Sequence, residues 1–115
     1  MKIYLAGPMR GIKMYNHPAF DRAAAILRAE GHEVFSPAEH DRELWPDLDW
    51  PNMTGDMAQD GITPRDMRDV IGADLSWIAQ QAEAIALLPG WERSRGVKAE
   101  RALADFLGLY VREMF

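Results

Sequence analysis

The residues best suited to chemistry lie in the stretch Ser94-Arg95-Gly96-Val97-Lys98-Ala99-Glu100. A Ser-x-Gly turn that opens a helix offers free backbone amides and a hydroxyl to an anion, and the glycine lets a ligand approach the backbone closely. Glu100 follows one turn inside the predicted helix. The spacing therefore indicates a carboxylate beside an anionic ligand and chemistry on a nucleotide, although a plain helix start with a surface glutamate would have the same residues.

Two further segments carry groups of the same kind. Gly7-Pro8-Met9-Arg10-Gly11 follows the apolar run of residues 2–6, and Arg10 can make paired hydrogen bonds to a phosphate or a carboxylate. Asp74 lies on the edge of the apolar stripe of a predicted helix. Each segment also has a plainer explanation, namely a strand exit with a surface arginine and a solvated or capping aspartate. Because all three segments lead to one edge of the predicted sheet, we expect them to form a single site.

The elements that must position these residues alternate between strand and helix patterns. Short apolar runs ended by glycine or proline predict strands at residues 2–6, 33–36 and 83–88, and a short fourth strand is expected over residues 109–114. Apolar residues at helical spacing predict helices over 18–30, from 63 onward and over 97–107. The predicted buried faces are Phe20, Ala23, Ala24 and Leu27, then Met67, Val70, Ile71, Asp74/Leu75 and Ile78, then Val97, Leu103, Phe106 and Leu107. This alternation predicts an α/β fold with a short parallel sheet of about four strands, and ligands outside the carboxyl ends of the strands.

The segment from Pro37 to Thr63 breaks this alternation. It carries several prolines and glycines among Trp45, Trp50 and two methionines, without a sustained period. Connections longer than about 12 to 15 residues are usually lids, binding loops or disordered segments, and the tryptophans argue against disorder. We therefore expect a long Pro/Trp/Met-rich loop over residues 37–63, with at most a short helical turn, that covers a substrate or contacts another subunit.

The composition restricts the classes of function. A chain of 115 residues that is 48% hydrophobic and 27% charged is typical of one soluble globular domain over residues 1–115. The net charge of -5 argues against a broad surface for a nucleic-acid polymer or an anionic membrane. The longest apolar runs, about five residues, are far shorter than the roughly 20 that span a membrane. The absence of cysteine and of a signal peptide favours a cytoplasmic location.

The three histidines do not indicate a metal site. His17, His32 and His40 lack the spacing of metal ligands, and the carboxylates form no calcium-loop pattern. We therefore expect these histidines to be surface or loop residues, and we expect no metal and no cofactor.

In their order along the chain, the motifs resemble those of the nucleoside 2-deoxyribosyltransferase superfamily, which includes the deoxynucleoside 5'-monophosphate N-glycosidases. The turn Gly7-Pro8-Met9-Arg10-Gly11 resembles the phosphate-binding strand exit Gly-Ser-Ile-Arg-Gly of those glycosidases. The run Asp74-Leu75-Ser76-Trp77-Ile78 resembles their Asp-Leu-x-Trp-Leu helix, and Ser94, Gly96 and Glu100 match their Ser-x-Gly-x-x-x-Glu helix start. The overall pattern is most similar to a small, largely uncharacterised phage and bacterial branch of the superfamily.

This resemblance implies a Rossmann-like or flavodoxin-like three-layer fold and chemistry at an N-glycosidic bond. Glu100 would attack the anomeric carbon of a deoxyribosyl group, and Asp74 would protonate or orient the departing base. Water or a second base would then resolve the glycosyl-enzyme. Lys98 and Arg95 would keep Glu100 ionised and slightly favour phosphorylated substrates. The expected substrate-binding residues are Gly7, Met9, Arg10, Gly11, Tyr15, Ser94 and Gly96, with the Trp45/Trp50 segment over the sugar or base.

The expected partner is a small-molecule nucleotide or nucleoside. The known transferases continue with further sheet residues past the position of Phe115, so we expect a neighbouring subunit to complete the site in a homo-oligomer. An alternative from another class is a non-catalytic nucleotide-binding module on the same fold, acting as a sensor or as a factor that sequesters a metabolite.

Overall fold

Four parallel strands form a single sheet. The computed structural model describes residues 1–115, and its strands follow the spatial order β2-β1-β3-β4. All three neighbouring pairs are parallel, with Tyr4 of β1 opposite Phe35 of β2 and Ile85 of β3. The strands are β1 (Lys2–Ala6), β2 (Glu33–Phe35), β3 (Ala84–Leu87) and β4 (Tyr110–Glu113). The predicted parallel α/β sheet is confirmed.

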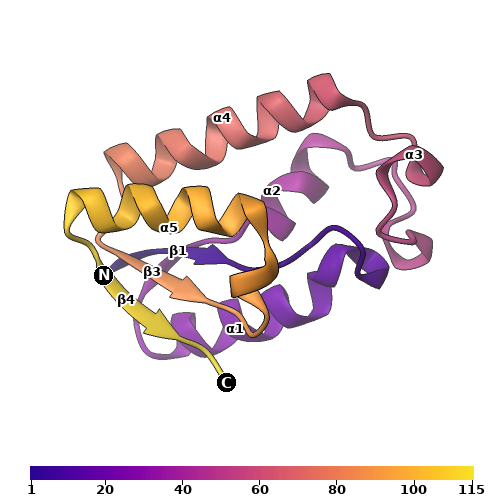
Figure 1. Ribbon diagram of the computed structural model, residues 1–115. Coiled ribbons are helices and arrows are strands. Elements are labelled where there is room, and N and C mark those ends of the chain that lie inside the picture. Colours follow the sequence, from indigo (N-terminus) through magenta and orange to yellow (C-terminus); the bar gives the residue numbers. More distant parts are fainter.

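Three long helices cover the two faces of this sheet and give the three-layer arrangement. Helix α1 (His17–Ala29) lies on one side, and α4 (Pro64–Gln80) and α5 (Arg95–Leu107) lie on the other (Figure 1). Successive residues of a strand point to opposite faces, so Ile3 and Leu5 pack toward α1 whereas Tyr4 and Ala6 pack toward α4 and α5. Two separate apolar cores result, one on each face of the sheet.

The expectation of a loop over residues 37–63 is wrong for its first third. Residues Pro37–Leu44 form helix α2, which packs against α1. Proline suits the first turn of a helix, and the buried residues of α2 include Ala38 and Asp41. Because these two residues form no strongly apolar stripe, the helical period was not visible in the sequence. Short helices follow at η2 (Trp50–Asn52) and α3 (Met57–Asp60), while η1 (Lys13–Asn16) and η3 (Trp91–Arg93) precede α1 and α5.

Some residues assigned to buried helix faces are exposed. In α4 the buried stripe is Val70, Asp74 and Ile78, at i, i+4 and i+8, which turns Ile71 to solvent. In α5 the buried positions are Val97 and Ala104, while Leu107 is exposed and Phe106 is 86% exposed. The sequence pattern located both helices but set the buried face one residue off at these positions. None of the helices combines the length and the apolar character that crossing a bilayer would need.

The order of the strands marks one edge of the sheet as a place for ligands. The chain leaves β1 for β2 on one side and later returns through β3 on the other side, so the direction of winding reverses between β1 and β3. In open α/β sheets, ligands bind outside the carboxyl ends of the strands at such a reversal. The residues that follow β1 and β3 are Gly7 to Gly11 and Leu88 to Gly96.

Candidate active site

A buried tyrosine on the central strand organises the polar residues under α4 and α5. Tyr4 lies on the face of β1 that these helices cover, and its side chain is fully buried. Its hydroxyl donates a hydrogen bond to Oε2 of Glu100. A buried tyrosine hydroxyl needs such a partner. The Tyr4 hydroxyl therefore fixes the position of the Glu100 carboxyl group above the middle of the sheet.

Helix α5 turns Glu100 toward the sheet. The helix begins after Ser94, whose Oγ accepts a hydrogen bond from the amide of Val97 at 3.2 Å. Val97 and Ala104 are buried against the sheet, and Glu100 lies between them on the same face at i+3 from Val97 and i−4 from Ala104. The predicted helix start is present, and Ser94 acts in it as an N-cap. Gly96 lies in the exposed first turn.

Helix α4 brings the second carboxyl group to the same tyrosine. Asp74 is 6% exposed, and its Oδ1 is buried without a hydrogen-bond partner. The charge of Asp74 raises the pKa of Tyr4, which places Asp74 close to the hydroxyl that binds Glu100. Two carboxyl groups that are 26 positions apart in the sequence thus lie near one phenol. The structure thus brings these two groups together, although neither of them lines the hollow beside Trp50 or the hollow beside Trp91.

Burial shifts the pKa values of all three groups upward. Burial raises the pKa of Glu100 to about 8, against the opposing effect of the hydrogen bond from Tyr4. Burial also raises the pKa of Asp74 to about 7. The pKa of Tyr4 lies well above its usual value because of burial and then the charges of Glu100 and Asp74. Perturbed carboxyl groups of this kind are typical of functional sites, because burial of charge without an opposite charge costs stability.

The expected effect of Lys98 and Arg95 on Glu100 is wrong. Both side chains are exposed on α5, and neither contributes to the pKa of Glu100. Charges in solvent are screened, whereas the Glu100 carboxyl group lies under the helix. The protein therefore raises the pKa of Glu100 instead of holding it ionised.

A third buried carboxyl group lies nearby. Asp41 of α2 is 9% exposed, and its Oδ1 also has no hydrogen-bond partner. Burial and then the charge of Asp74 raise its pKa to about 7. The buried polar cluster therefore comprises Tyr4, Asp41, Asp74 and Glu100, which come from β1, α2, α4 and α5.

The turns that leave β1 and β3 touch each other at the carboxyl edge of the sheet. A Cβ atom on Gly7 would lie 2.7 Å from the side chain of Leu88, so only glycine fits there. A Cβ atom on Gly90 would lie 3.4 Å from Pro8. The turn over Gly7 to Gly11 and the segment that leads into α5 are therefore neighbours, as the sequence predicts.

The other predicted binding residues of the turn after β1 differ in their exposure and contacts. Arg10 is exposed and forms no ion pair, so its guanidinium is free to bind an anion. Gly11 is exposed, adopts φ +80°, and donates its amide to the carbonyl of Gly55 at 3.0 Å. Met9 is partly buried against both the α1 core and the cluster around Trp50.

The aromatic residues expected over the sugar or base pack elsewhere. The Tyr15 hydroxyl donates to Oδ2 of Asp60 at 2.7 Å, and the Tyr15 ring lies edge-on to Trp50 with centroids 6.1 Å apart. Trp50 is buried and stacks on His17 at 4.7 Å, while Trp45 packs beside it. The structure thus brings Tyr15, Trp45 and Trp50 into a separate apolar cluster rather than to the Tyr4 hydroxyl.

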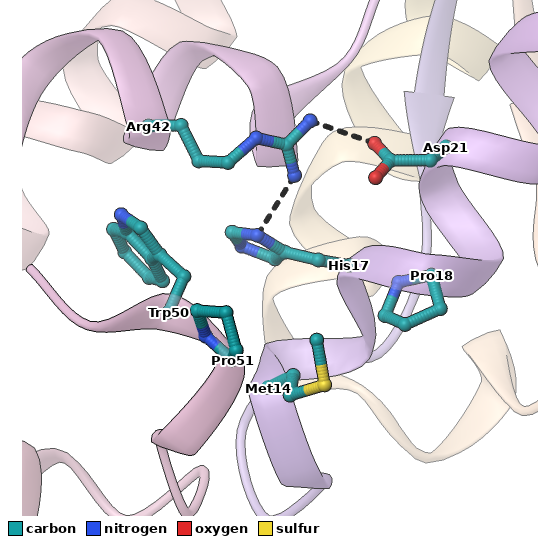
Figure 2. A pocket seen from close by; sticks show the side chains of 7 residues that line it. All are labelled: Met14, His17, Pro18, Asp21, Arg42, Trp50 and Pro51. Carbon is teal, nitrogen blue, oxygen red and sulfur yellow. Dashed lines mark hydrogen bonds and ion pairs between the residues drawn. The ribbon is translucent and has the colours of Figure 1, made fainter. Parts of the chain in front are cut away.

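His17 is a buried histidine, which corrects the expectation of a surface or loop residue. It is 2% exposed at the start of α1, where Nη1 of Arg42 lies 3.0 Å from its Nδ1 (Figure 2). Burial and then the charge of Arg42 lower its pKa to about 4, so the ring is neutral at pH 7. His17 borders a hollow of about 390 Å³ whose other lining residues are Met14, Pro18, Asp21, Arg42, Trp50 and Pro51.

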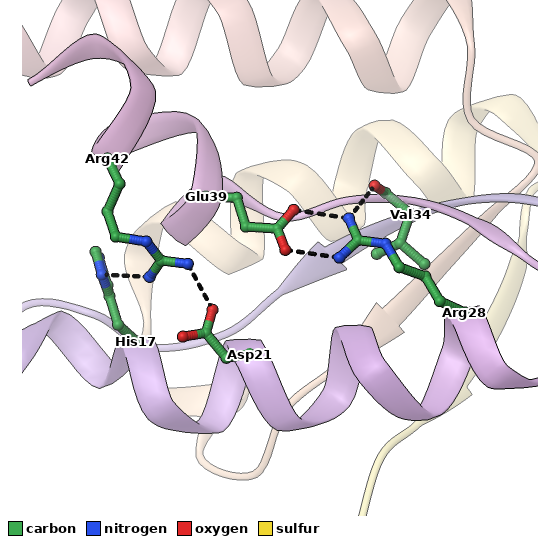
Figure 3. A network of polar contacts seen from close by, with 6 residues as sticks. All are labelled: His17, Asp21, Arg28, Val34, Glu39 and Arg42. Atoms are coloured by element: carbon green, nitrogen blue, oxygen red, sulfur yellow. Dashed lines mark hydrogen bonds and ion pairs between the residues drawn. The ribbon is translucent and has the colours of Figure 1, made fainter. Parts of the chain in front are cut away.

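Ion pairs fix α2 against α1 beside this hollow. Arg42 also donates to Asp21 at 2.8 Å, and Arg28 donates to both carboxylate oxygens of Glu39 at 2.6 and 2.7 Å (Figure 3). Paired arginine–carboxylate contacts of this geometry restrain both partners. The hollow contains none of the four residues of the buried polar cluster. The two ion pairs between α1 and α2 therefore hold α2, and with it Asp41, in place.

Sequence reasoning missed Tyr4 and Asp41. A signal for Tyr4 was available, because a tyrosine in a strand that is otherwise apolar requires a hydrogen-bond partner once it is buried. Asp41 gave no comparable signal, since it lay in a segment interpreted as a loop.

A comparison of sequences places the chain in a family. A family model described as a domain of unknown function, DUF4406, matches residues 1–113. No curated protein and no solved structure matches the chain. The match covers all four strands and all the residues of the buried polar cluster. The chain therefore belongs to the DUF4406 family.

Proposed function

We propose that this protein cleaves or exchanges the N-glycosidic bond of a deoxynucleotide or deoxynucleoside, with Glu100 as the nucleophile. The observation that carries the proposal is the pair of carboxyl groups at Tyr4: the half-buried Glu100 accepts a hydrogen bond from the Tyr4 hydroxyl, and the buried Asp74 lies close to the same hydroxyl. A nucleophilic carboxylate and a second carboxylic acid are the two groups that a double displacement at a glycosidic carbon requires.

In the proposed first step, an oxygen of the ionised Glu100 attacks C1' of the sugar, and the bond from C1' to the base nitrogen breaks. The electron pair of that bond remains on the base, and Asp74 donates its proton to a ring nitrogen of the base. Tyr4 is a positioning residue, because its hydrogen bond stabilises the charged form of Glu100 before the attack. The products are a free base and a glycosyl ester on Glu100.

In the second step, water attacks C1' and gives its proton to the Asp74 carboxylate, which regenerates both side chains. If a second base attacks instead, the result is base exchange. This sequence needs no metal and no cofactor, because both proton transfers and the covalent bond use carboxyl groups.

We further propose that the edge of the sheet holds the sugar phosphate. Arg10 has no protein partner, and the first turn of α5, which follows the N-cap Ser94, offers the amides of Arg95 and Gly96 to an anion. Gly7, Met9 and Gly11 shape the neighbouring turn. The proposed substrate is thus a small cytoplasmic metabolite rather than a nucleic-acid polymer. A homo-oligomer, in which a neighbouring subunit contributes to the site, remains part of the proposal.

The direct test is release of free base from a panel of deoxynucleoside monophosphates and deoxynucleosides, with and without an acceptor base. We expect release from at least one of them, and we expect Glu100→Ala to abolish it. Asp105→Asn is a matched control, because it removes an exposed carboxylate from the same helix. If no substrate releases base, or if Glu100→Ala releases it at the wild-type rate, the proposal is wrong.

One observation favours a second candidate, a nucleotide-binding module without turnover. With a pKa of about 8, Glu100 carries a proton at pH 7 in the free protein, which weakens it as a nucleophile. In that case, nucleotides should raise the melting temperature of the wild type and of Glu100→Ala equally, and Arg10→Ala should remove the effect. A thermal-shift screen without stabilisation by any nucleotide would exclude this candidate.

A further inference from the structure

Asp41 is a buried carboxyl group that the proposed mechanism does not use. Its side chain is 9% exposed, and Oδ1 has no hydrogen-bond partner. The adjacent Arg42 does not neutralise it through an ion pair, since that guanidinium binds His17 and Asp21 (Figure 3). A buried carboxyl group without a hydrogen-bond partner destabilises a fold by about 1–3 kcal/mol when it is neutral. The cost is larger when the group is ionised. A ligand would supply the missing partner.

The surroundings of Asp41 bring it to the same region as Asp74. The ring of Phe35 lies 5.5 Å from Tyr4, 5.3 Å from His40 of α2 and 5.1 Å from Trp77 of α4, measured between ring centroids. Asp41 directly follows His40, and Asp74 lies one helical turn before Trp77. The charge of Asp74 acts on Asp41, which agrees with this placement. Each of the two carboxyl groups has an unpartnered Oδ1.

A protonated carboxyl group beside an ionised one can bind a ligand that presents one hydrogen-bond acceptor next to one donor. The first donates one hydrogen bond, and the second accepts one. Adenine presents the matching edge, because its N7 accepts and its neighbouring N6 amino group donates. Cytosine presents the same pattern through N3 and its N4 amino group. Hypoxanthine and uracil carry a carbonyl oxygen in place of the amino group, and this oxygen would face the lone pairs of a carboxylate.

We propose that Asp41 determines base specificity by accepting a hydrogen bond from the exocyclic amino group of adenine or cytosine, while Asp74 donates its proton to the adjacent ring nitrogen. This inference rests on the proposed N-glycosidic function. The proton from Asp74 stays on N7 of adenine or N3 of cytosine, so the base leaves as a neutral molecule. In the complex the amino group pairs with the ionised form of Asp41, which is a binding residue and not the acid.

The test compares two matched substrate pairs, dAMP with dIMP and dCMP with dUMP. We expect the wild type to favour the amino member of whichever pair it accepts by at least about tenfold in kcat/KM, because the oxo member leaves the buried carboxylate unpaired. Asp41→Asn keeps the shape of the side chain but adds an amide donor for a carbonyl oxygen. We expect it to abolish or reverse the preference. Glu43→Gln is the matched control, since it removes an exposed carboxylate from the same helix.

The outcomes separate this inference from the proposed function. Release of base with equal rates for amino and oxo members, or with an oxo preference, overturns the role of Asp41 and leaves the glycosidase proposal standing. An amino preference that survives unchanged in Asp41→Asn also overturns it. If Asp41→Asn does not fold, the wild-type preference alone decides. If no base is released, tighter binding of the amino members in a thermal-shift titration supports Asp41 and rejects only the chemistry, whereas equal binding rejects both.

Discussion

At the scale of single residues, one hydroxyl connects the groups on which the proposed chemistry depends. Tyr4 donates to Glu100 and acts on the pKa of Asp74, although the three residues come from a strand and two helices. A hydrogen bond to a charged group contributes about 1.5–3 kcal/mol. Because Tyr4 stabilises the ionised form of Glu100, it opposes the effect of burial on the pKa of this carboxyl group.

Replacing Tyr4 with phenylalanine removes this hydrogen bond and keeps the ring. The pKa of Glu100 should then rise further above about 8, because the opposing effect of Tyr4 is lost. We expect kcat/KM at pH 7 to fall by about 10- to 100-fold, and the pH profile to move to higher pH. Tyr110→Phe is the control, since Tyr110 is an exposed tyrosine. An unchanged rate and profile for Tyr4→Phe would show that the bond has no role in activity.

The two carboxyl groups also predict the pH dependence of the reaction. The proposed mechanism needs Glu100 ionised and Asp74 protonated, and their pKa values lie at about 8 and about 7. Activity should therefore be bell-shaped with limbs near these values, which belong to the coupled pair as a whole, and with a maximum at about pH 7.5. Asp74→Asn should be slower and should keep only the rising limb. A rate that is constant between pH 6 and pH 9 would contradict this assignment.

At the scale of elements, the turn after β1 is held by the distant segment around Gly55. The amide of Gly11 donates to the Gly55 carbonyl, and the amide of Met14 donates to the carbonyl of Met53. Met14, Tyr15 and Asn16 all have positive φ, a conformation that costs free energy in residues other than glycine. The segment around Gly55 therefore fixes a strained turn next to the proposed phosphate site.

Gly55→Ala tests this dependence. The added Cβ would lie 2.3 Å from the carbonyl oxygen of Ile12, and Gly55 has φ +92°. We expect a loss of more than about 2 kcal/mol in the free energy of unfolding, together with weaker nucleotide binding, because backbone atoms cannot move aside cheaply. Gly61→Ala is the control: its φ is +78° but no atom lies within 4 Å, so it should cost only about 1 kcal/mol. If Gly55→Ala and Gly61→Ala lost the same free energy of unfolding in denaturant titrations, the expected clash with Ile12 would be contradicted.

At the scale of the whole molecule, the sequence predicted the elements whose signals are local. The strands β1, β2 and β3 are short segments near glycine or proline with buried apolar residues, and α4 begins with the capping box of Thr63 and Asp66. Helix α2 was missed because its burial depends on ion pairs with α1 and not on an apolar stripe. The contact of Tyr4 with Glu100 joins residues 96 positions apart, and no local pattern specifies such a contact.

The buried carboxyl groups make the stability of the whole fold depend on pH. Asp41, Asp74 and Glu100 have raised pKa values, so between about pH 4.5 and pH 8 the native state binds more protons than the unfolded state. The free energy of unfolding then falls as pH rises, by about 1.4 kcal/mol per pH unit for each extra proton. His17, with a pKa lowered to about 4, opposes this trend by one proton up to about pH 6.5. We therefore expect a net loss of stability from about pH 5 to pH 8.

Asp74→Asn should reduce this loss, because asparagine needs no proton to be neutral. We expect the variant to be more stable than the wild type at pH 8, on the order of 2 kcal/mol, and to show no gain at pH 4, where Asp74 is already protonated. Urea unfolding at the two pH values measures the difference, with Asp105→Asn as an exposed control expected to change stability by less than about 0.5 kcal/mol. A substitution that stabilises the fold while slowing the reaction would indicate that Asp74 is kept at the expense of stability. An equal effect of Asp74→Asn at both pH values would instead mean that burial does not shift the pKa of Asp74, and the assignment of Asp74 as the acid would then lose its physical basis.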